Sequence, residues 1–335
     1  MKTPLLPVLF SMAVALVGHT AEPYHFLKEI PVGGDTGWDC LSVDSAAQRL
    51  YVSHGTKVVV IDLAKDAVAG EVTNTPGVHA LVPAPELGRG LATCGKEDCA
   101  ALVDLKTLQI LSKVPTGANP DVAVYEAARQ EFYVFNGRGQ SATVIEAKSG
   151  QAVATIALGG KPEFAQVDSK AGQLYVNIED KNEVAVIDVK TRAVIHRWPI
   201  APGEAASGLA FDEANHRLFL GCDNHLLAML DTASGKVLAT VPLGEGVDGC
   251  AFDPATRLAF GSCGDGTTTI AREDGDKLTP VQLLTTEKSA RTMAIDPATH
   301  KIYLPSAKFE PAAPGQRRGK MVPGTFKILV YGTGK

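Results

Sequence analysis

The chain repeats one phrase of about 42 residues seven times, and this repeat limits its fold more than any other feature. In the clearest copies, residues 39–54 and 248–263, an acid opens a short alternating run, a turn follows, and a β-branched or aromatic run comes next. The opening residues of the seven copies are Asp39, His79, Asp121, Glu163, Ser207, Asp248 and Arg291, which lie 40, 42, 42, 44, 41 and 43 positions apart. Because the copies nearly exhaust the chain, they predict one domain of seven similar units.

Each copy contains four short runs that are typical of β-strands. The third run usually ends in an acid, as in VVVIDL, VAVIDV and LAMLDT, and a turn such as TASGK leads to the fourth run. Helical periodicity is missing throughout. Four strands in a repeat of this length are the signature of a propeller blade. We therefore predict an all-β fold, a seven-bladed β-propeller with four-stranded blades.

The two ends of the chain predict how the ring closes. The seventh copy lacks its fourth strand, since the chain ends at FKILVYGTGK, while residues 25–37 look like a fourth strand and its linker. An N-terminal strand that completes the last blade would remove an exposed sheet edge.

The stretches QLYVNIEDKNEVAVIDVKTRAVIHRWPI and QRLYVSHGTKVVVIDLAKDAVAGEV resemble the repeats of the YVTN-type, or YncE-like, propeller family. The resemblance covers essentially the whole mature chain. It implies an exported bacterial seven-bladed propeller that binds something, and it carries over no set of catalytic residues.

The N-terminus predicts export. Lys2 precedes an apolar segment, residues 5–18, that is too short to span a bilayer, and small residues follow at Thr20 and Ala21. We predict a signal peptide over residues 1–21, a single propeller domain over 22–335, and a periplasmic or secreted protein without a membrane span after cleavage. The alternative is an uncleaved anchor or a disordered tail.

The net charge bears on the class of binding partner, and the cysteines bear on possible disulfides. The formal net charge of -5 gives no electrostatic footprint for nucleic acid, so binding of nucleic acid is not expected. Cys94 and Cys99 flank a short polar loop between two strand-like runs, which makes them a candidate disulfide. The sequence assigns no pairing to the remaining cysteines, which are Cys40, Cys222, Cys250 and Cys263.

The repeat also predicts a candidate site. In a propeller the first residues of the innermost strands surround one mouth of the channel, so the seven opening residues should form a ring there. The same face should carry the loops at 53–55, 136–138, 179–181, 223–225 and 265–266. The ring is either a solvated polar rim or a real site. Its carboxylates would suit Ca²⁺ or Mg²⁺, and His79 would favour a transition metal.

The function expected from these observations is an extracytoplasmic binding or scaffold protein, more a binder than an enzyme, and a monomer. It would recognise a small ligand, a metal or a protein partner at the channel mouth. The alternative is a metal-dependent hydrolase of the lactonase kind, or a lyase, in which His79 and Glu163 act as a pair. An insertion at 306–324, which includes Arg317, Arg318 and Lys320, is either a solvated loop or, on the same face as the ring, a lid or a partner contact.

Overall fold

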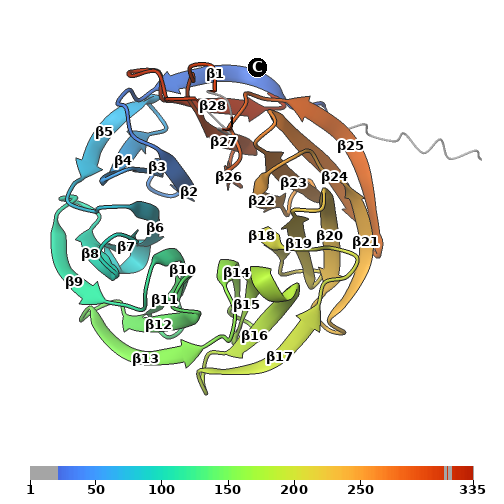
Figure 1. The fold of residues 1–335 in the computed structure, drawn as a ribbon, viewed down its shortest axis with the longest axis horizontal. Helices are drawn as coiled ribbons and strands as arrows, with labels where there is room; N and C mark the ends of the chain where they lie inside the picture. The colour runs from blue at the N-terminus through green and yellow to red at the C-terminus, as the bar shows by residue number, and fades with distance from the viewer. Residues whose placement is uncertain (1–21, 313–314, 316–318, 335) are drawn as a thin grey trace, which may run out of the picture.

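The computed structural model describes residues 22–312, 315 and 319–334, which form a closed ring of seven four-stranded antiparallel sheets (Figure 1). The seven-bladed propeller expected from the repeat is confirmed. The expected signal peptide, residues 1–21, lies outside the described residues. Within the described part of the chain, no helix is long and apolar enough to cross a membrane.

Blades are numbered here from the one that contains β2, and each runs from the channel outwards. The innermost strands are β2 (Trp38–Asp44), β6 (Val78–Ala84), β10 (Pro120–Glu126), β14 (Pro162–Asp168), β18 (Ala206–Asp212), β22 (Val247–Asp253) and β26 (Ala294–Asp296). The second strands are β3 (Arg49–His54), β7 (Arg89–Cys94), β11 (Glu131–Asn136), β15 (Gln173–Ile178), β19 (Arg217–Cys222), β23 (Leu258–Cys263) and β27 (Lys301–Ser306).

The outer half of each blade completes the sheets. The third strands are β4 (Lys57–Asp62), β8 (Cys99–Asp104), β12 (Ser141–Glu146), β16 (Glu183–Asp188), β20 (Leu226–Asp231), β24 (Thr267–Asp274) and β28 (Lys327–Gly332). The outermost strands are β5 (Ala67–Val72), β9 (Ile110–Pro115), β13 (Gln151–Ala157), β17 (Ala193–Pro199), β21 (Lys236–Pro242), β25 (Lys277–Thr285) and β1 (His25–Pro31). Two 3₁₀ turns, η1 (Pro85–Leu87) and η2 (Glu179–Lys181), lie between strands.

The middle strands carry the core because each is covered on both faces by the adjoining blades. In β4 the consecutive residues Val58, Val59, Val60 and Ile61 are all buried. A continuous apolar run of β-branched residues is what a strand buried on both faces requires. The outermost strands have one solvated face, so their sequences mix polar and apolar residues.

The acid that ends most of the innermost strands is part of this scaffold. At the end of β22, Asp253 accepts a hydrogen bond from the Ala255 amide at 3.1 Å and another from the Thr256 hydroxyl at 2.8 Å. Arg257, which follows, has a positive φ of 56°. The carboxylate thus holds the turn that reverses the chain into the second strand, the role of Asp in such turns.

The ring closes as the ends of the chain predict. Strand β1 pairs antiparallel with β28, with Ile30 opposite Ile328, so the N-terminal strand is the outermost strand of blade 7. The two are seen side by side at the top of Figure 1.

Blade 7 departs from the expected regularity at its inner edge. Strand β26 has only three residues, and Arg291 lies just before it in irregular backbone. The Arg291 carbonyl instead accepts hydrogen bonds from the Gly249 amide, at 2.9 Å, and from the Ser262 hydroxyl. The start of this blade is therefore tied to blade 6 rather than to its own second strand.

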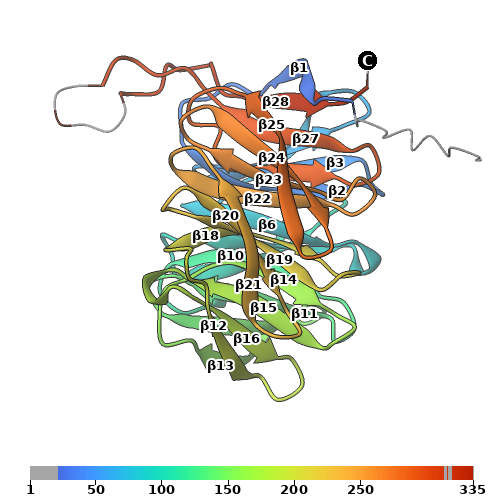
Figure 2. The ribbon, with the colours of Figure 1, turned by 90° about the vertical axis from the view of Figure 1, so that its right-hand side faces the viewer.

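The insertion after β27 forms an arm beside the channel mouth. Phe309 and Met321 form an antiparallel bridge, and the Phe309 ring lies 5.9 Å from the ring of Trp38, the residue before Asp39. Figure 2 shows the arm extending beyond the body of the propeller. Arg317 and Arg318 of the predicted lid lie outside the described residues, so its role stays a prediction.

Candidate functional site

A break in strand pairing occurs at the start of nearly every innermost strand, where the ring residues sit. The register between β2 and β3 shifts between Trp38 and Leu41, and Asp39 lies in that interval. The same shift occurs in the next five blades, at the equivalent positions. Bulges of this kind redirect side chains and are frequent near functional sites. They are the local reason why the opening residues of these six blades lie outside the regular strand pairing.

Most of the ring lines one cavity of about 370 Å³ at the channel mouth. Its walls include Asp39, Asp121, Glu163, Ser207, Asp248 and Arg291 from the predicted ring, together with Lys161, Glu179 and Asp223. Carboxylates therefore outnumber the basic groups in the cavity wall. A small polar or positively charged ligand suits such a cavity better than an apolar one.

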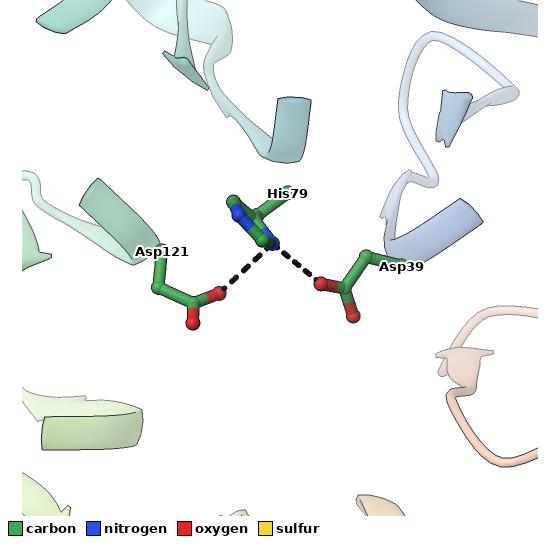
Figure 3. A group of neighbouring side chains, drawn as sticks. All are labelled: Asp39, His79 and Asp121. Carbon is green, nitrogen blue, oxygen red and sulfur yellow. Dashed lines mark hydrogen bonds and ion pairs between the residues drawn. The ribbon is translucent and has the colours of Figure 1, made fainter. Parts of the chain in front are cut away.

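The seventh ring residue, His79, lies between two of these acids. Its Nδ1 atom is 2.6 Å from Asp39 Oδ2 and 3.4 Å from Asp121 Oδ1 (Figure 3). The three side chains come from the innermost strands β2, β6 and β10 of consecutive blades. Their ligand atoms all lie within 4.8 Å of one another, so the group could hold a metal ion. We call Asp39, His79 and Asp121 the Asp–His–Asp cluster.

Protonation within the cluster follows from burial and crowding of like charges. Burial raises the pKa of Asp121, and His79 opposes this rise. The carboxylates of Asp39 and Glu163 add to it, so the pKa of Asp121 is about 7. Burial lowers the pKa of His79, but the hydrogen bond to Asp39 and the negative charges of both acids outweigh it, so this pKa is raised. A proton is thus held between the imidazole and the two carboxylates near neutral pH.

The rest of the ring compensates its acids with permanent cations. Lys161 Nζ lies 2.7 Å from Glu163 Oε1, and Arg291 Nε lies 3.1 Å from Asp248 Oδ2. The Ser207 hydroxyl bridges them, at 2.9 Å from Asp248 Oδ1 and 3.5 Å from Glu163 Oε2. Burial raises the pKa of both acids, and the adjacent cation limits the rise in each case. We call these five residues the ion-paired half of the ring.

The residues that follow the first four ring positions form an apolar layer in the channel. Cys40, Ala80 and Val122 are buried together, and Phe164 packs against them. Cys40 and Phe164 line the polar cavity and also a second, more apolar cavity of about 390 Å³ deeper in the channel. The polar groups of the ring therefore rest on an apolar layer, which strengthens the interactions among their charges.

Residues outside the predicted ring fix the orientation of His79. A Cβ atom at Gly95 would lie 2.6 Å from His79 Nε2, so the imidazole packs directly against the backbone of Gly95. With Nε2 against Gly95, the atom that faces the two carboxylates is Nδ1. Sequence reasoning missed this contact, although Gly follows the second strand at Gly55, Gly95, Gly137 and Gly264, and that recurrence was a signal.

The loops that the repeat assigned to the same face have different roles. Glu179 and Asp223 line the cavity. His54 does not face it as a free polar group, because it is buried and its ring stacks on Phe326 at 4.5 Å. Lys161 was not anticipated as a partner of Glu163; its place two positions before that residue, just ahead of β14, was the available signal.

The sequence suggested two residue pairs, His79 with Glu163 and Cys94 with Cys99, and the structure treats them differently. His79 contacts Asp39 and Asp121, whereas Glu163 contacts Lys161 and Ser207, so the suggested pair of His79 with Glu163 is replaced by other partners. All six cysteines are free thiols in the described chain. Cys94 and Cys99 nevertheless lie directly opposite each other at the end of the β7–β8 hairpin, so their disulfide stays a prediction.

Comparisons with known proteins support the fold alone. No protein-family model matches the chain, and no curated protein matches it. Among solved structures, the chain is similar to hydrazine synthase of Kuenenia stuttgartiensis, with a TM-score of 0.71 and 16% identity, over 82% of this chain and 94% of that one. At this identity the likeness concerns the propeller architecture and not the activity.

Proposed function

We propose that this protein is a binding protein that holds a divalent transition-metal cation in the Asp–His–Asp cluster at the channel mouth. The observation that carries the proposal is the convergence of two carboxylate oxygens and one imidazole nitrogen within 4.8 Å of one another. The ligands would be the carboxylates of Asp39 and Asp121 and the Nδ1 atom of His79.

The spacing of the ligand atoms supports this assignment. Two ligands about 2.1 Å from a tetrahedral ion lie roughly 3.4 Å apart. The 3.4 Å between His79 Nδ1 and Asp121 Oδ1 matches that separation, and the 2.6 Å to Asp39 is the length of a hydrogen bond. A cation would replace the proton between them and require Asp39 to move outwards by less than 1 Å, so binding would release a proton.

The donor set favours Zn²⁺ or Mn²⁺ over Ca²⁺ and Mg²⁺. Calcium and magnesium are bound almost entirely by oxygen atoms, whereas an imidazole combined with carboxylates suits zinc and other first-row metals. Three protein ligands leave coordination positions open. The cavity of about 370 Å³ is large enough for a small ligand to share the ion.

A binding role agrees better with the contacts than the hydrolase or lyase alternative. Catalysis would need a proton-transfer group next to the ion, and Glu163, the candidate for that role, contacts Lys161 and Ser207 instead.

We further propose that the protein is an exported monomer of the YVTN-repeat type, periplasmic or secreted. This rests on the apolar N-terminal segment and the repeated phrases of the sequence.

Calorimetric titration of the chelator-treated protein with Mn²⁺, Zn²⁺, Ca²⁺ and Mg²⁺ tests the proposal. We expect one equivalent of Mn²⁺ or Zn²⁺ to bind with a dissociation constant in the micromolar range or below. Asp39→Asn should weaken this binding at least 100-fold. The matched control Asp223→Asn removes a carboxylate from the same cavity wall but outside the cluster, and it should change the affinity less than three-fold.

The proposal is wrong if no transition metal binds, or if Asp223→Asn abolishes binding while Asp39→Asn does not. Thermal unfolding of each variant shows whether a loss of binding reflects loss of the fold.

A further inference from the structure

The two cysteines at the end of the β7–β8 hairpin are placed to form a reversible disulfide. Cys94 is the last residue of β7, Cys99 is the first of β8, and they are direct partners in the strand register. Opposite residues of antiparallel strands have Cα atoms about 4.5 to 5.5 Å apart, and a disulfide needs about 4.4 to 6.8 Å. The two thiols already contact each other. The bond could form without rearranging the sheet.

The four-residue loop between these cysteines supports the first of two cation ligands. Gly95 packs against His79, and its amide donates to the Gly77 carbonyl at 3.0 Å. Gly77 lies two residues before His79 and leads into β6. The position of Gly95 therefore determines how far the imidazole can tilt away from the carboxylates.

The other end of the same loop supports Asp121. Asp98 Oδ1 accepts a hydrogen bond from the Asn119 amide at 2.7 Å, and the Asp98 carbonyl accepts one from the Thr116 amide at 3.0 Å. Asn119 lies two residues before Asp121. One short loop thus contacts the backbone or side chains that set the positions of two of the three cluster members.

We propose that Cys94 and Cys99 are a redox-active dithiol, and that their oxidation by a disulfide compound fixes this loop and tightens cation binding in the Asp–His–Asp cluster. The part that concerns cation affinity rests on the proposed function. The part that concerns the dithiol and its loop does not.

The reaction is a thiol–disulfide exchange. Cys99 is 8% exposed and Cys94 is fully buried, so Cys99 reacts first. Its thiolate attacks one sulfur of the oxidant, the oxidant's S–S bond breaks, and one thiol leaves. The Cys94 thiolate then attacks Cys99 Sγ and releases the second thiol. Two protein thiols are oxidised, one external disulfide is reduced, and the two cysteine protons end on the two released thiols.

The expected effect is that of fixing the support of a metal ligand. Changes in the groups that orient ligands alter metal affinity about 10- to 100-fold. The hydrogen bonds of Gly95 and Asp98 already restrain the loop in the reduced protein, so the disulfide adds only part of the restraint. We therefore expect oxidation to strengthen cation binding by about 10-fold.

The test compares the full chain after treatment with reduced or oxidised glutathione, followed by removal of the reagent. Peptide mass mapping should show a linked Cys94–Cys99 pair after oxidation only. Hydrogen exchange should slow at residues 95–98 and at Asn119. Titration with Mn²⁺, a cation that thiolates bind poorly, should give an affinity about 10-fold higher in the oxidised protein.

Variants identify the cysteines responsible. The double variant Cys94→Ser/Cys99→Ser should bind Mn²⁺ as the reduced protein does and should ignore the oxidant. The matched double variant Cys222→Ser/Cys263→Ser, which alters two buried cysteines of other blades, should respond like the parent.

The possible failures separate the two proposals. If the Cys94–Cys99 bond does not form, or forms without slowing exchange in the loop, the dithiol proposal is overturned. If Mn²⁺ binds equally well in both states, the coupling is overturned and the proposed function stands. If exchange slows but Mn²⁺ binds in neither state, the cation site is wrong and the link between dithiol and loop stands.

Discussion

Blades 1 to 3 and blades 4 to 7 contribute similar residues to the ring, but the acids in the two parts have different partners. Glu163 and Asp248 each contact a permanent cation, Lys161 or Arg291. Asp39 and Asp121 share the imidazole of His79, whose charge depends on a proton. The acids of blades 4 to 7 are therefore paired with permanent cations, whereas those of blades 1 to 3 depend on a proton that the proposed metal cation would displace.

The largest effect should come from removing the imidazole. His79→Gln deletes a proposed cation ligand and should weaken Mn²⁺ or Zn²⁺ binding by at least about 100-fold. Ser207→Ala, in the ion-paired half of the ring, should leave the affinity within about three-fold. Calorimetric titration measures both variants. Equal losses would mean that the ring acts as one diffuse acidic surface and that the comparison between its parts is false.

A pH-dependent change in stability should distinguish the acids of the two parts. The pKa of Asp121 is about 7 in the folded protein against an ordinary value of 3.8, so the folded state binds this proton more tightly than the unfolded chain does. Ionisation of Asp121 then costs folding stability as the pH rises from about 4 to about 7, and the full cost remains at higher pH. The pKa difference corresponds to about 4 kcal/mol, from which loss of the ionic contact with His79 subtracts. Asp121→Asn should therefore stabilise the metal-free protein at pH 8 by about 2 kcal/mol and have little effect at pH 4.

Urea unfolding at both pH values measures this difference in the free energy of unfolding. Asp248→Asn is the control, because it removes a buried acid but also leaves Arg291 without its partner, so its gain should be smaller. With saturating Mn²⁺ the order should reverse, and the protein with Asp121 intact should be the more stable. A destabilised Asp121→Asn variant at pH 8 without metal would contradict the assignment.

A smaller effect is expected from the glycine that positions the imidazole. Gly95→Ala would put a methyl group 2.6 Å from His79 Nε2 and push the ring from its place, which should weaken cation binding by about 10-fold. Gly137 is the equivalent glycine next to Asp121, and the nearest atom to a Cβ there is 3.4 Å away. Gly137→Ala should therefore change the affinity little. Titration of both variants shows whether the contact with Gly95 matters.

The smallest effect should come from breaking an ion pair at the rim. The side chain of Arg291 is 53% exposed, and exposed pairs contribute about 1 kcal/mol or less. Arg291→Gln should lower the free energy of unfolding by no more than this, and less at high salt because the pair is screened. A loss of several kcal/mol, or a loss of cation binding, would show that the ion-paired half of the ring is part of the site.

The repeat predicted the fold and the ring because both depend on backbone register, which a periodic sequence determines. It assigned Asp39, His79 and Asp121 to equivalent positions of consecutive blades, but it could not give the direction of their side chains. That direction depends on the bulge in each innermost strand and, for His79, on the contact with Gly95. Lys161 was missed because it lies outside the repeated phrase. The short β26 was missed because the backbone just before it, at Arg291, bonds to blade 6.

Closure of the ring places blade 7 beside Asp39, one of the proposed cation ligands. The Thr292 hydroxyl of blade 7 donates to the Asp39 carbonyl of blade 1 at 2.8 Å, across the junction that the two terminal strands complete. Thr292 belongs to the seventh blade along the chain, so blade 1 lacks this neighbour until the six preceding blades have been synthesised. If the proposed cation binds, its loading would follow synthesis of blade 7, and the metal content of a preparation would report on how many molecules had closed correctly.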